Sequence, residues 1–214
     1  MDNSYITLER IGEGTYEEKK SVFIGVAYPI ETEEDALEVI RAHKKQYYDA
    51  RHNCYAYILK DGVTQRFSDD GEPQGSAGLP MLNVLSKKGL CGACVVVTRY
   101  FGGTLLGVGG LVRAYTQATV DAVADAGIKR YEKFRDVSVR LSYSDYQKLG
   151  KLMAPFTLID ETTDFTDSVT VSFSVLTEET DRLASVLTES GNGRWAVELG
   201  AERWGFRSVE QVDQ

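Results

Sequence analysis

The spacing of hydrophobic positions predicts both strands and helices in the first half of the chain. Residues 21–30 and 95–100 carry apolar runs with the length of a buried strand. Residues 32–50 instead repeat apolar positions at helical spacing, with acidic residues early and basic residues late, as the helix dipole favours. Thr32 and Asp35 have the spacing of a capping box, which predicts that this helix begins directly after Thr32.

A hairpin and a long polar loop are predicted between these elements. Residues 54–59 and 63–67 are strand-like and flank an Asp-Gly pair, which is typical of tight turns. The stretch SDDGEPQGSAG, residues 68–78, is polar and rich in glycine, and it is too long for a simple turn. A helix is predicted to begin near residue 76 or 79 and to end near residue 88.

The second half of the chain alternates more regularly between segments with the hydrophobic spacing of a strand and segments with that of a helix. Its predicted elements are, in order, a strand at 135–143, a helix at 145–156, strands at 157–165 and 168–176, a helix at 178–191 and a strand at 195–205. This β-α-β-β-α-β order is that of the ferredoxin-like fold. We therefore expect an α+β protein with domains at residues 1–130 and 134–206, joined by a linker near residues 128–134.

Length and composition are those of an ordinary globular protein. The 214 residues are 43% hydrophobic and 26% charged, which suits one or two domains with real cores. The N-terminus lacks the basic and apolar start of a secretory signal, and no apolar run reaches the length of a membrane span. An odd count of 3 cysteines points to a reducing compartment, so a cytoplasmic protein without a membrane partner is expected.

The charge is unevenly distributed along the chain. A net charge of −8 argues against a protein that coats nucleic acid through its overall field. Residues 1–133 hold 16 basic and 18 acidic residues, whereas residues 134–214 hold 8 and 14. Any surface that binds anions is therefore expected in the first half.

The stretch VVVTRYFGGTLLGVGGLVRAY, residues 95–115, places five glycines between a predicted strand and a helix that is predicted to begin at Leu111 and to end near Gly127. A Walker A loop is excluded, because Val108 and Gly109 stand where its lysine and hydroxyl residue are required. A dinucleotide-binding fingerprint is excluded by Val112, which replaces its last glycine.

Two interpretations of this stretch remain. Backbone N–H groups near Gly107 and Gly110, together with Arg99 and Arg113, could bind an anion at the start of the helix. Alternatively, the glycines only permit close packing and unusual backbone angles, and the arginines are ordinary surface residues.

The polar loop clusters three carboxylates, Asp69, Asp70 and Glu72. Such a cluster could hold a divalent cation, but the EF-hand pattern is absent. Ion pairs to nearby arginines explain the same pattern equally well, with Arg51, Arg66 and Arg99 as the candidates. Neither a metal ion nor a cofactor is expected.

The cysteines suggest two further sites. Cys54, Cys91 and Cys94, with His52, supply ligands that zinc accepts, but buried cysteines on strands are the expected arrangement. No nucleophile with a base and an orienting group is recognisable, so catalysis is not expected. The stretch RAHKKQYYDARHNCYAY, residues 41–57, interleaves basic and aromatic residues, as surfaces for single-stranded nucleic acid do.

Three stretches together, RHNCYAY, SDDGEPQGSAG and VVVTRYFGGTLLGVGGLVRAY, resemble the IMPACT/YigZ family over most of residues 16–125. Leu79 departs from the pattern, because many members have a lysine there. The resemblance implies that the first domain shares the ribosomal-protein fold of domain four of elongation factor G. It implies that the second domain is similar to domain five of that factor, and that the protein is linked to the regulation of translation.

The expected function is that of a non-enzymatic translation-linked regulatory factor that binds RNA, the ribosome or a translation protein through its N-terminal domain. The alternative is an enzyme of unknown reaction that binds a small phosphate ligand between the SDDGEP loop and the glycine-rich turn. A third possibility is an assembly surface at Tyr100 and Phe101. The candidate binding residues are Arg51, His52, Asp69, Asp70, Glu72, Arg99, Tyr100, Gly102, Gly103, Gly107, Gly109, Gly110 and Arg113.

Overall fold

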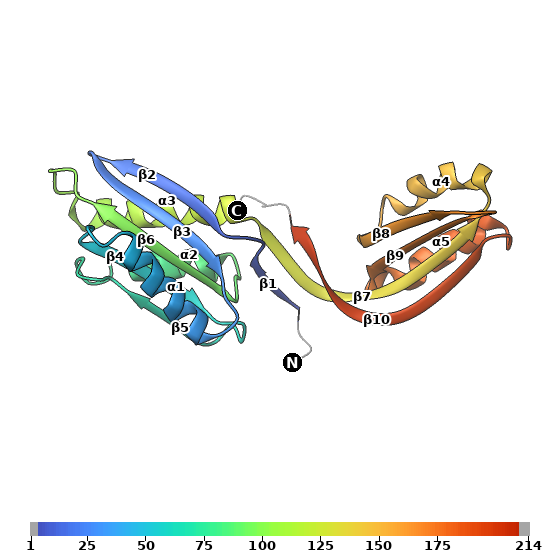
Figure 1. Cartoon of the computed structure of the whole chain (residues 1–214), viewed down its shortest axis with the longest axis horizontal. Coiled ribbons are helices and arrows are strands. Elements are labelled where there is room, and N and C mark those ends of the chain that lie inside the picture. Colours follow the sequence, from blue (N-terminus) through green and yellow to red (C-terminus); the bar gives the residue numbers. More distant parts are fainter. Residues whose placement is uncertain (1–3, 210–214) are drawn as a thin grey trace. The chain divides into compact units, whose positions relative to one another are not determined.

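The computed structural model describes residues 4–209, which divide into two compact units (Figure 1). The first unit holds residues 5–130 with 208 and 209, and the second holds residue 4 with 131–207. Strands β7 (Ile128–Leu141) and β10 (Ala196–Val209) each contribute residues to both units. The boundary between the units, at residues 130 and 131, falls within the predicted linker near residues 128–134, and the chain there belongs to strand β7.

The first unit is built on a five-stranded antiparallel sheet. Its order is β2-β3-β6-β4-β5, and β1 (Tyr5–Leu8) precedes it in the chain. The strands are β2 (Gly12–Glu18), β3 (Ser21–Pro29), β6 (Ala93–Tyr100), β4 (His52–Ile58) and β5 (Gln65–Ser68). The predicted hairpin at residues 54–67 is confirmed by the pairing of β4 with β5.

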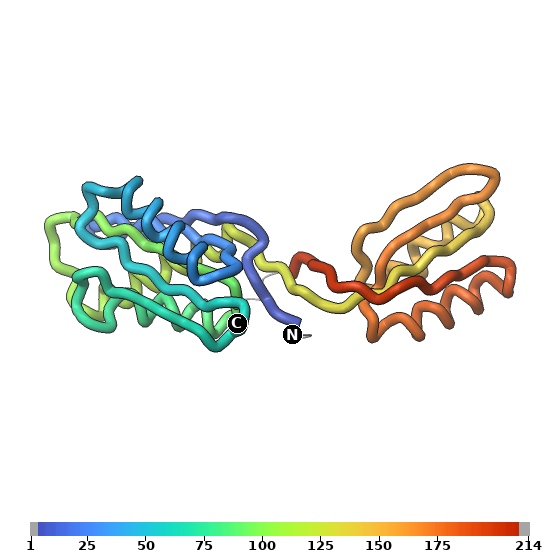
Figure 2. Tube along the Cα trace, turned by 60° about the horizontal axis from the view of Figure 1, so that its bottom comes forward, coloured from blue at the N-terminus to red at the C-terminus, as the bar shows by residue number. Residues whose placement is uncertain are grey.

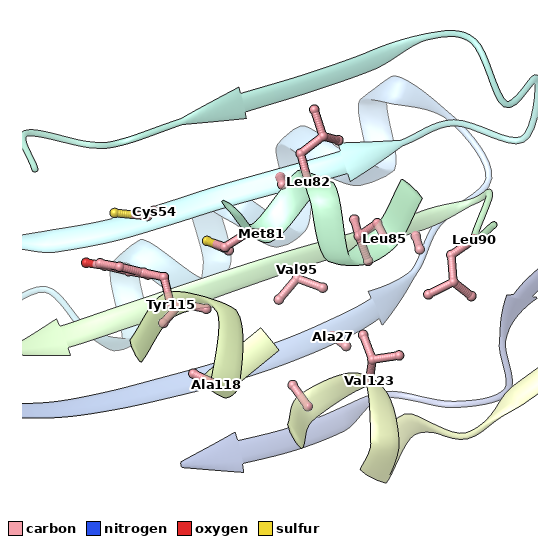
Figure 3. Packing of buried hydrophobic residues seen from close by; sticks show 14 of the residues in the cluster. Ala27, Cys54, Met81, Leu82, Leu85, Leu90, Val95, Tyr115, Ala118 and Val123 are labelled. Carbon is pink, nitrogen blue, oxygen red and sulfur yellow. The ribbon is translucent and has the colours of Figure 1, made fainter. Parts of the chain in front are cut away.

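Helices cover both faces of this sheet. Helices α2 (Gly78–Lys87) and α3 (Gly107–Ala126) pack on one face and α1 (Glu33–Gln46) on the other. Figure 3 shows Met81 and Leu85 of α2 near Val95 of the central strand, Val123 of α3 near Ala27, and the Tyr115 ring of α3 extending toward Cys54, all within one core cluster. The capping box is confirmed, because the Thr32 hydroxyl accepts from the Asp35 N–H and the Asp35 carboxylate accepts from the Thr32 N–H.

Strand β2 was not predicted, because its inward positions are glycines rather than hydrophobic residues. A Cβ on Gly12 would overlap the backbone nitrogen of Ala126, and a Cβ on Gly14 would lie 2.5 Å from that of Ala122. The absence of side chains lets α3 lie directly on the strand. A hydrophobicity pattern cannot detect a strand whose core contact is made by backbone.

A buried polar chain ties α1 to the sheet. Thr98 donates its hydroxyl to Asn53 Oδ1 at 2.6 Å, so it accepts from His43 Nε2–H at 2.8 Å. The other ring nitrogen, Nδ1, then accepts from the Tyr28 hydroxyl at 3.0 Å. His43 is 1% exposed, and burial lowers its pKa to about 4.

The second unit has the predicted β-α-β-β-α-β order of elements (Figure 2). Its own strands follow the order β10-β7-β9-β8, with β8 at Leu158–Phe165 and β9 at Val169–Leu176, and β1 also pairs with β7 as the fifth strand of this sheet. Helices α4 (Tyr143–Met153) and α5 (Thr180–Gly191) pack on one face, and a short 3-10 turn, η1 (Thr177–Glu179), precedes α5. Within residues 4–209, none of the helices is both long and apolar enough to cross a membrane.

Candidate functional site

The first carboxylate of the polar loop, residues 68–78, has a structural task. Asp69 Oδ1 accepts from the backbone N–H groups of Ala77 at 3.1 Å and Gly78 at 2.8 Å, and its Oδ2 accepts from Gly75 at 2.8 Å. Helix α2 begins here without a cap from its own N-cap residue. The carboxylate therefore serves as the missing cap, with a charge that the positive end of the helix favours.

The second carboxylate fixes the loop to its neighbours. Asp70 binds the Lys44 ammonium at 2.7 Å through Oδ1 and accepts the Asn53 N–H at 2.7 Å through Oδ2. Its backbone carbonyl accepts from His52 Nδ1 at 2.9 Å, which places the proton of that ring on Nδ1. His52 is thus held as part of the loop anchor.

The third carboxylate, Glu72, lies in a buried ion pair. Arg99 Nη1 contacts both of its oxygens, at 2.7 and 3.0 Å, and the Tyr115 hydroxyl donates to Oε1 at 2.8 Å. The side chains of Arg99 and Glu72 are 8% and 3% exposed. Burial raises the pKa of the Tyr115 hydroxyl, so it remains a donor.

The sequence hypothesis that Arg99 is displayed to a ligand is wrong, although the alternative of an ion pair to the acidic loop is confirmed for Arg99 and Glu72. The physical reason is the alternation of β6. Val95, Val97 and Arg99 share one face of the strand, and the two valines belong to the core beneath α2 and α3. Arg99 therefore points inward, with its guanidinium 5.6 Å from the ring centre of Phe23.

The alternative function predicts that Asp69, Asp70, Arg99 and Arg113 converge in one pocket, and this convergence stays a prediction. The first three are occupied by contacts within the fold, whereas Arg113 is exposed on α3. Across residues 4–209, no three His, Cys, Asp or Glu side chains gather as metal ligands. The zinc set is divided by the sheet, since Cys54 lies in the core beneath α2 and Cys94 in the core beneath α1.

The third cysteine does not fit the expectation of buried strand residues. Cys91 is partly exposed and precedes β6, whereas Cys54 and Cys94 are buried on strands as expected. Burial raises the pKa of the Cys54 and Cys94 thiols, so both stay protonated and unreactive.

The glycine-rich loop, residues 101–106, forms an exposed part of the first unit. Phe101 and Leu105 are 57% and 82% exposed, and Gly103 has a positive φ of 85°. Gly102 packs so tightly on the turn at Lys20 that a Cβ would overlap its backbone. Tyr100, expected to be exposed, is only partly exposed and donates its hydroxyl to Asp49 at 2.8 Å.

Helix α3 begins at Gly107, four residues before the predicted Leu111, and its first turn is electrostatically unbalanced. The N-cap residue, Leu106, offers no side-chain cap, and no acidic residue lies in the first turn. A Cβ on Gly109 would lie 3.9 Å from Arg113 Nη1, so the guanidinium extends back over the glycines. Two positive features, a helix N-terminus and an arginine, thus adjoin each other, and an anion would relieve both.

Two lysines beside this loop were missed by the sequence analysis. Lys19 and Lys20 form the turn between β2 and β3 with φ angles of 48° and 66°. Left-handed angles are costly for side chains of this kind and concentrate at functional sites. Two adjacent lysines before an apolar strand were the sequence signal for this basic turn. The signal could be recognised only once β2 was known, because the turn connects β2 to β3. We call Lys19, Lys20, Phe101, Gly102, Gly103, Gly107, Gly109, Gly110 and Arg113 the glycine-loop surface.

The basic and aromatic stretch at residues 41–57 is divided between roles. His43 is in the core and Lys44 is paired with Asp70, so neither is available to a ligand. Tyr48 is 84% exposed, and Arg51 is exposed as well. The predicted nucleic-acid surface is therefore reduced to a few side chains in this stretch.

Comparisons with known proteins cover the part of the chain that contains the acidic loop and the glycine-loop surface. The Impact N-terminal domain matches residues 19–123. The chain is 33% identical to the IMPACT family member YvyE of Bacillus subtilis over 100% of its length, covering 99% of that protein. The chain belongs to the IMPACT family. This IMPACT family member is also 37% identical to YigZ of Escherichia coli, over 63% of this chain and 68% of that protein.

A solved structure resembles this IMPACT family member over nearly all of its length. It is the crystal structure of a hypothetical protein that is 28% identical, and the two superpose with a TM-score of 0.58. The superposition covers 94% of this chain and 98% of the other. The resemblance noted in the three sequence stretches is thus confirmed at the level of the family.

Proposed function

We propose that this IMPACT family member is a non-enzymatic factor linked to translation, which binds RNA through the phosphate backbone at its glycine-loop surface. The observation that carries the proposal is the uncapped start of α3, where the Arg113 guanidinium lies over Gly109 and Gly110. A phosphate would accept from the free backbone N–H groups and from the guanidinium at once. Ribosomal RNA is the form of RNA that the family resemblance favours.

The surroundings of this helix start suit a nucleic-acid backbone. Lys19 and Lys20 add two positive charges beside Gly102, and the exposed ring of Phe101 offers a face for stacking of a base. The net charge of −8 confines attraction to this local surface. Binding should therefore depend on geometry more than on overall charge.

The likeness to elongation factor domains supports a role on the ribosome. By that likeness, the first unit would correspond to domain four of elongation factor G and the second, with its ferredoxin-like order of elements, to domain five. The enzyme alternative has less support, since Asp69, Asp70 and Glu72 are each engaged within the fold. A translation protein as direct partner of the same surface is the competing outcome.

The test is fluorescence anisotropy with a labelled single-stranded RNA. The wild-type protein should bind at about 50 mM salt and lose affinity at about 200 mM salt, because counterions compete for the phosphates. Arg113→Gln should weaken binding by about tenfold, since a charge-assisted contact to phosphate is lost. Arg194→Gln is the matched control, because Arg194 is an exposed arginine of the second unit and belongs to neither candidate RNA-binding stretch.

Co-sedimentation with ribosomes tests whether the protein also binds RNA that is assembled in the ribosome. The proposal expects the wild-type protein in the ribosomal pellet at low salt and the Arg113→Gln variant largely in the supernatant. Equal pelleting of both variants, together with equal anisotropy, would contradict the proposal. Pelleting that depends on Arg113 without any binding of free RNA would point to a protein partner instead.

A further inference from the structure

The second unit leaves one face of its sheet without helices. Core residues Val137, Val139 and Val171 face α4 and α5, so their neighbours along the strands face the other way. Strand register pairs Ser138 with Ser172 on that opposite face. None of the helices among residues 131–207 packs on it.

This face contains a shallow depression of about 450 Å³. Its floor is made of short hydroxyl side chains, Ser138, Ser172 and Ser174. Carboxylates line it as well, and they are Asp136, Asp160 and Glu198. Short side chains on neighbouring strands let another chain lie close to the sheet, and hydroxyls offer it both donors and acceptors.

Arg203 of this chain is already bound by the carboxylates and serines of the depression. Arg203 Nε donates to Asp136 Oδ1 at 2.9 Å, and its Nη2 donates to Ser174 Oγ at 2.8 Å and pairs with Asp160. The Ser174 hydroxyl in turn donates to Asp136 at 2.6 Å, and these bonds lower the pKa of Asp136. Carboxylates and serines on this face thus already hold one guanidinium.

We propose that this face docks an extended segment of a partner protein that is rich in arginine and lysine. Three carboxylates line the depression against one guanidinium, and the side chains of Asp136 and Asp160 remain 46% and 66% exposed. Glu198 is exposed and contributes a negative charge to the depression. Residues 131–207 hold 13 acidic and 9 basic residues, so the unit as a whole attracts a cationic partner.

The same charges disfavour RNA at this face. A phosphate placed over the depression would meet three carboxylates at short range. A face of four strands spans about 15 Å, which is the length of about five extended residues. A short basic segment therefore matches the face in charge and in size, and this site is independent of the glycine-loop surface.

The test uses the full chain and a labelled peptide of alternating arginine and serine. Wild-type protein should bind the peptide at low salt and ignore a peptide of alternating glutamate and serine. The double variant Asp160→Asn with Glu198→Gln should weaken binding by at least about fivefold, because two attractive charges are removed. Ser172→Lys should abolish it, because an ammonium then occupies the floor. Glu189→Gln, on exposed α5, is the control with one acidic charge removed.

Backbone NMR on the full chain locates the peptide. Shifts at Ser138, Ser172 and Glu198 support the proposal, whereas shifts confined to residues 5–130 overturn it. Unchanged binding by the double variant overturns it even if Ser172→Lys does not fold. NMR shifts at these serines on addition of single-stranded RNA alone would also overturn it, because the face would then be an RNA site.

Discussion

At the scale of single residues, buried polar side chains hold the first unit together through defined proton positions. His43 is neutral and accepts from Tyr28 while donating to Thr98. Adding a second proton would place an N–H against the Tyr28 hydroxyl hydrogen and a charge in the core. The imidazole therefore couples helix α1 to the sheet only while it remains neutral.

The first prediction concerns the pH dependence of stability. The native pKa of His43 is lowered from 6.5 to about 4, so the unfolded chain binds the proton more readily between these values. The stability that His43 confers is complete above about pH 6.5 and declines as the pH falls toward 4. Urea unfolding should show a loss of about 2 kcal/mol between about pH 7.5 and about pH 5. His43→Gln should remove most of this slope, and an unchanged slope would contradict the assignment.

The second prediction concerns the buried pair of Glu72 and Arg99. Either Glu72→Leu or Arg99→Met leaves an unpaired charge in the core and should cost about 3–5 kcal/mol of unfolding free energy. The double variant should cost much less than the sum, because neither charge remains. Chemical denaturation of the wild type, the two single variants and the double variant gives the four unfolding free energies of a double-mutant cycle. Additive losses would mean that the two side chains do not stabilise each other.

At the scale of elements, the contact between β2 and α3 depends on glycines. Gly12→Ala should lower the unfolding free energy by about 3 kcal/mol or more, because the new Cβ would overlap the backbone nitrogen of Ala126. Gly150→Ala is the matched control. Its Cβ would meet no atom within 4 Å inside helix α4, so it should stabilise the protein by about 0.5–1 kcal/mol. Equal effects of the two substitutions in urea unfolding would contradict this packing.

The sequence predicts the elements whose contacts with the core are made by hydrophobic side chains or whose ends are marked by capping side chains. Apolar periodicity and the Thr32 cap were enough for α1, and regular alternation was enough for the order of elements in the second unit. Strand β2 escaped because backbone, rather than hydrophobic side chains, makes its core contact. Arg99 was misplaced because charge suggested a surface residue, whereas its position in the alternation of β6 placed it inside with Glu72.

For the candidate site, the sequence located the glycine loop but not its partners. Arg113 could be placed on the exposed side of a helix from spacing alone. The proximity of Lys20 to Gly102 depends on a tertiary contact between strands far apart in sequence. Helical periodicity likewise could not show that α3 begins four residues early, with an uncapped first turn.

At the scale of the whole molecule, each unit has a hydrophobic core of its own. Leu183 and Leu187 of α5 pack with Val171 and Phe173 in the second unit, separately from the residues beneath α2 and α3. Leu187→Ala should cost about 2–5 kcal/mol, because it opens a cavity in that core alone. Calorimetry should show a larger shift in the transition of the second unit than in that of the first. A uniform shift of a single transition would mean that the units unfold as one.

The left-handed turn at Lys19 and Lys20 is a position where a substitution is expected to change stability and RNA binding together. A two-residue turn with positive φ at both positions is made most readily by Asn-Gly, so Lys19→Asn with Lys20→Gly should raise the melting temperature. The same substitution removes two positive charges from the glycine-loop surface and should reduce RNA binding. Stability and affinity would then move in opposite directions at one turn. The lysine pair would then lower the stability of the turn while it serves the proposed RNA binding.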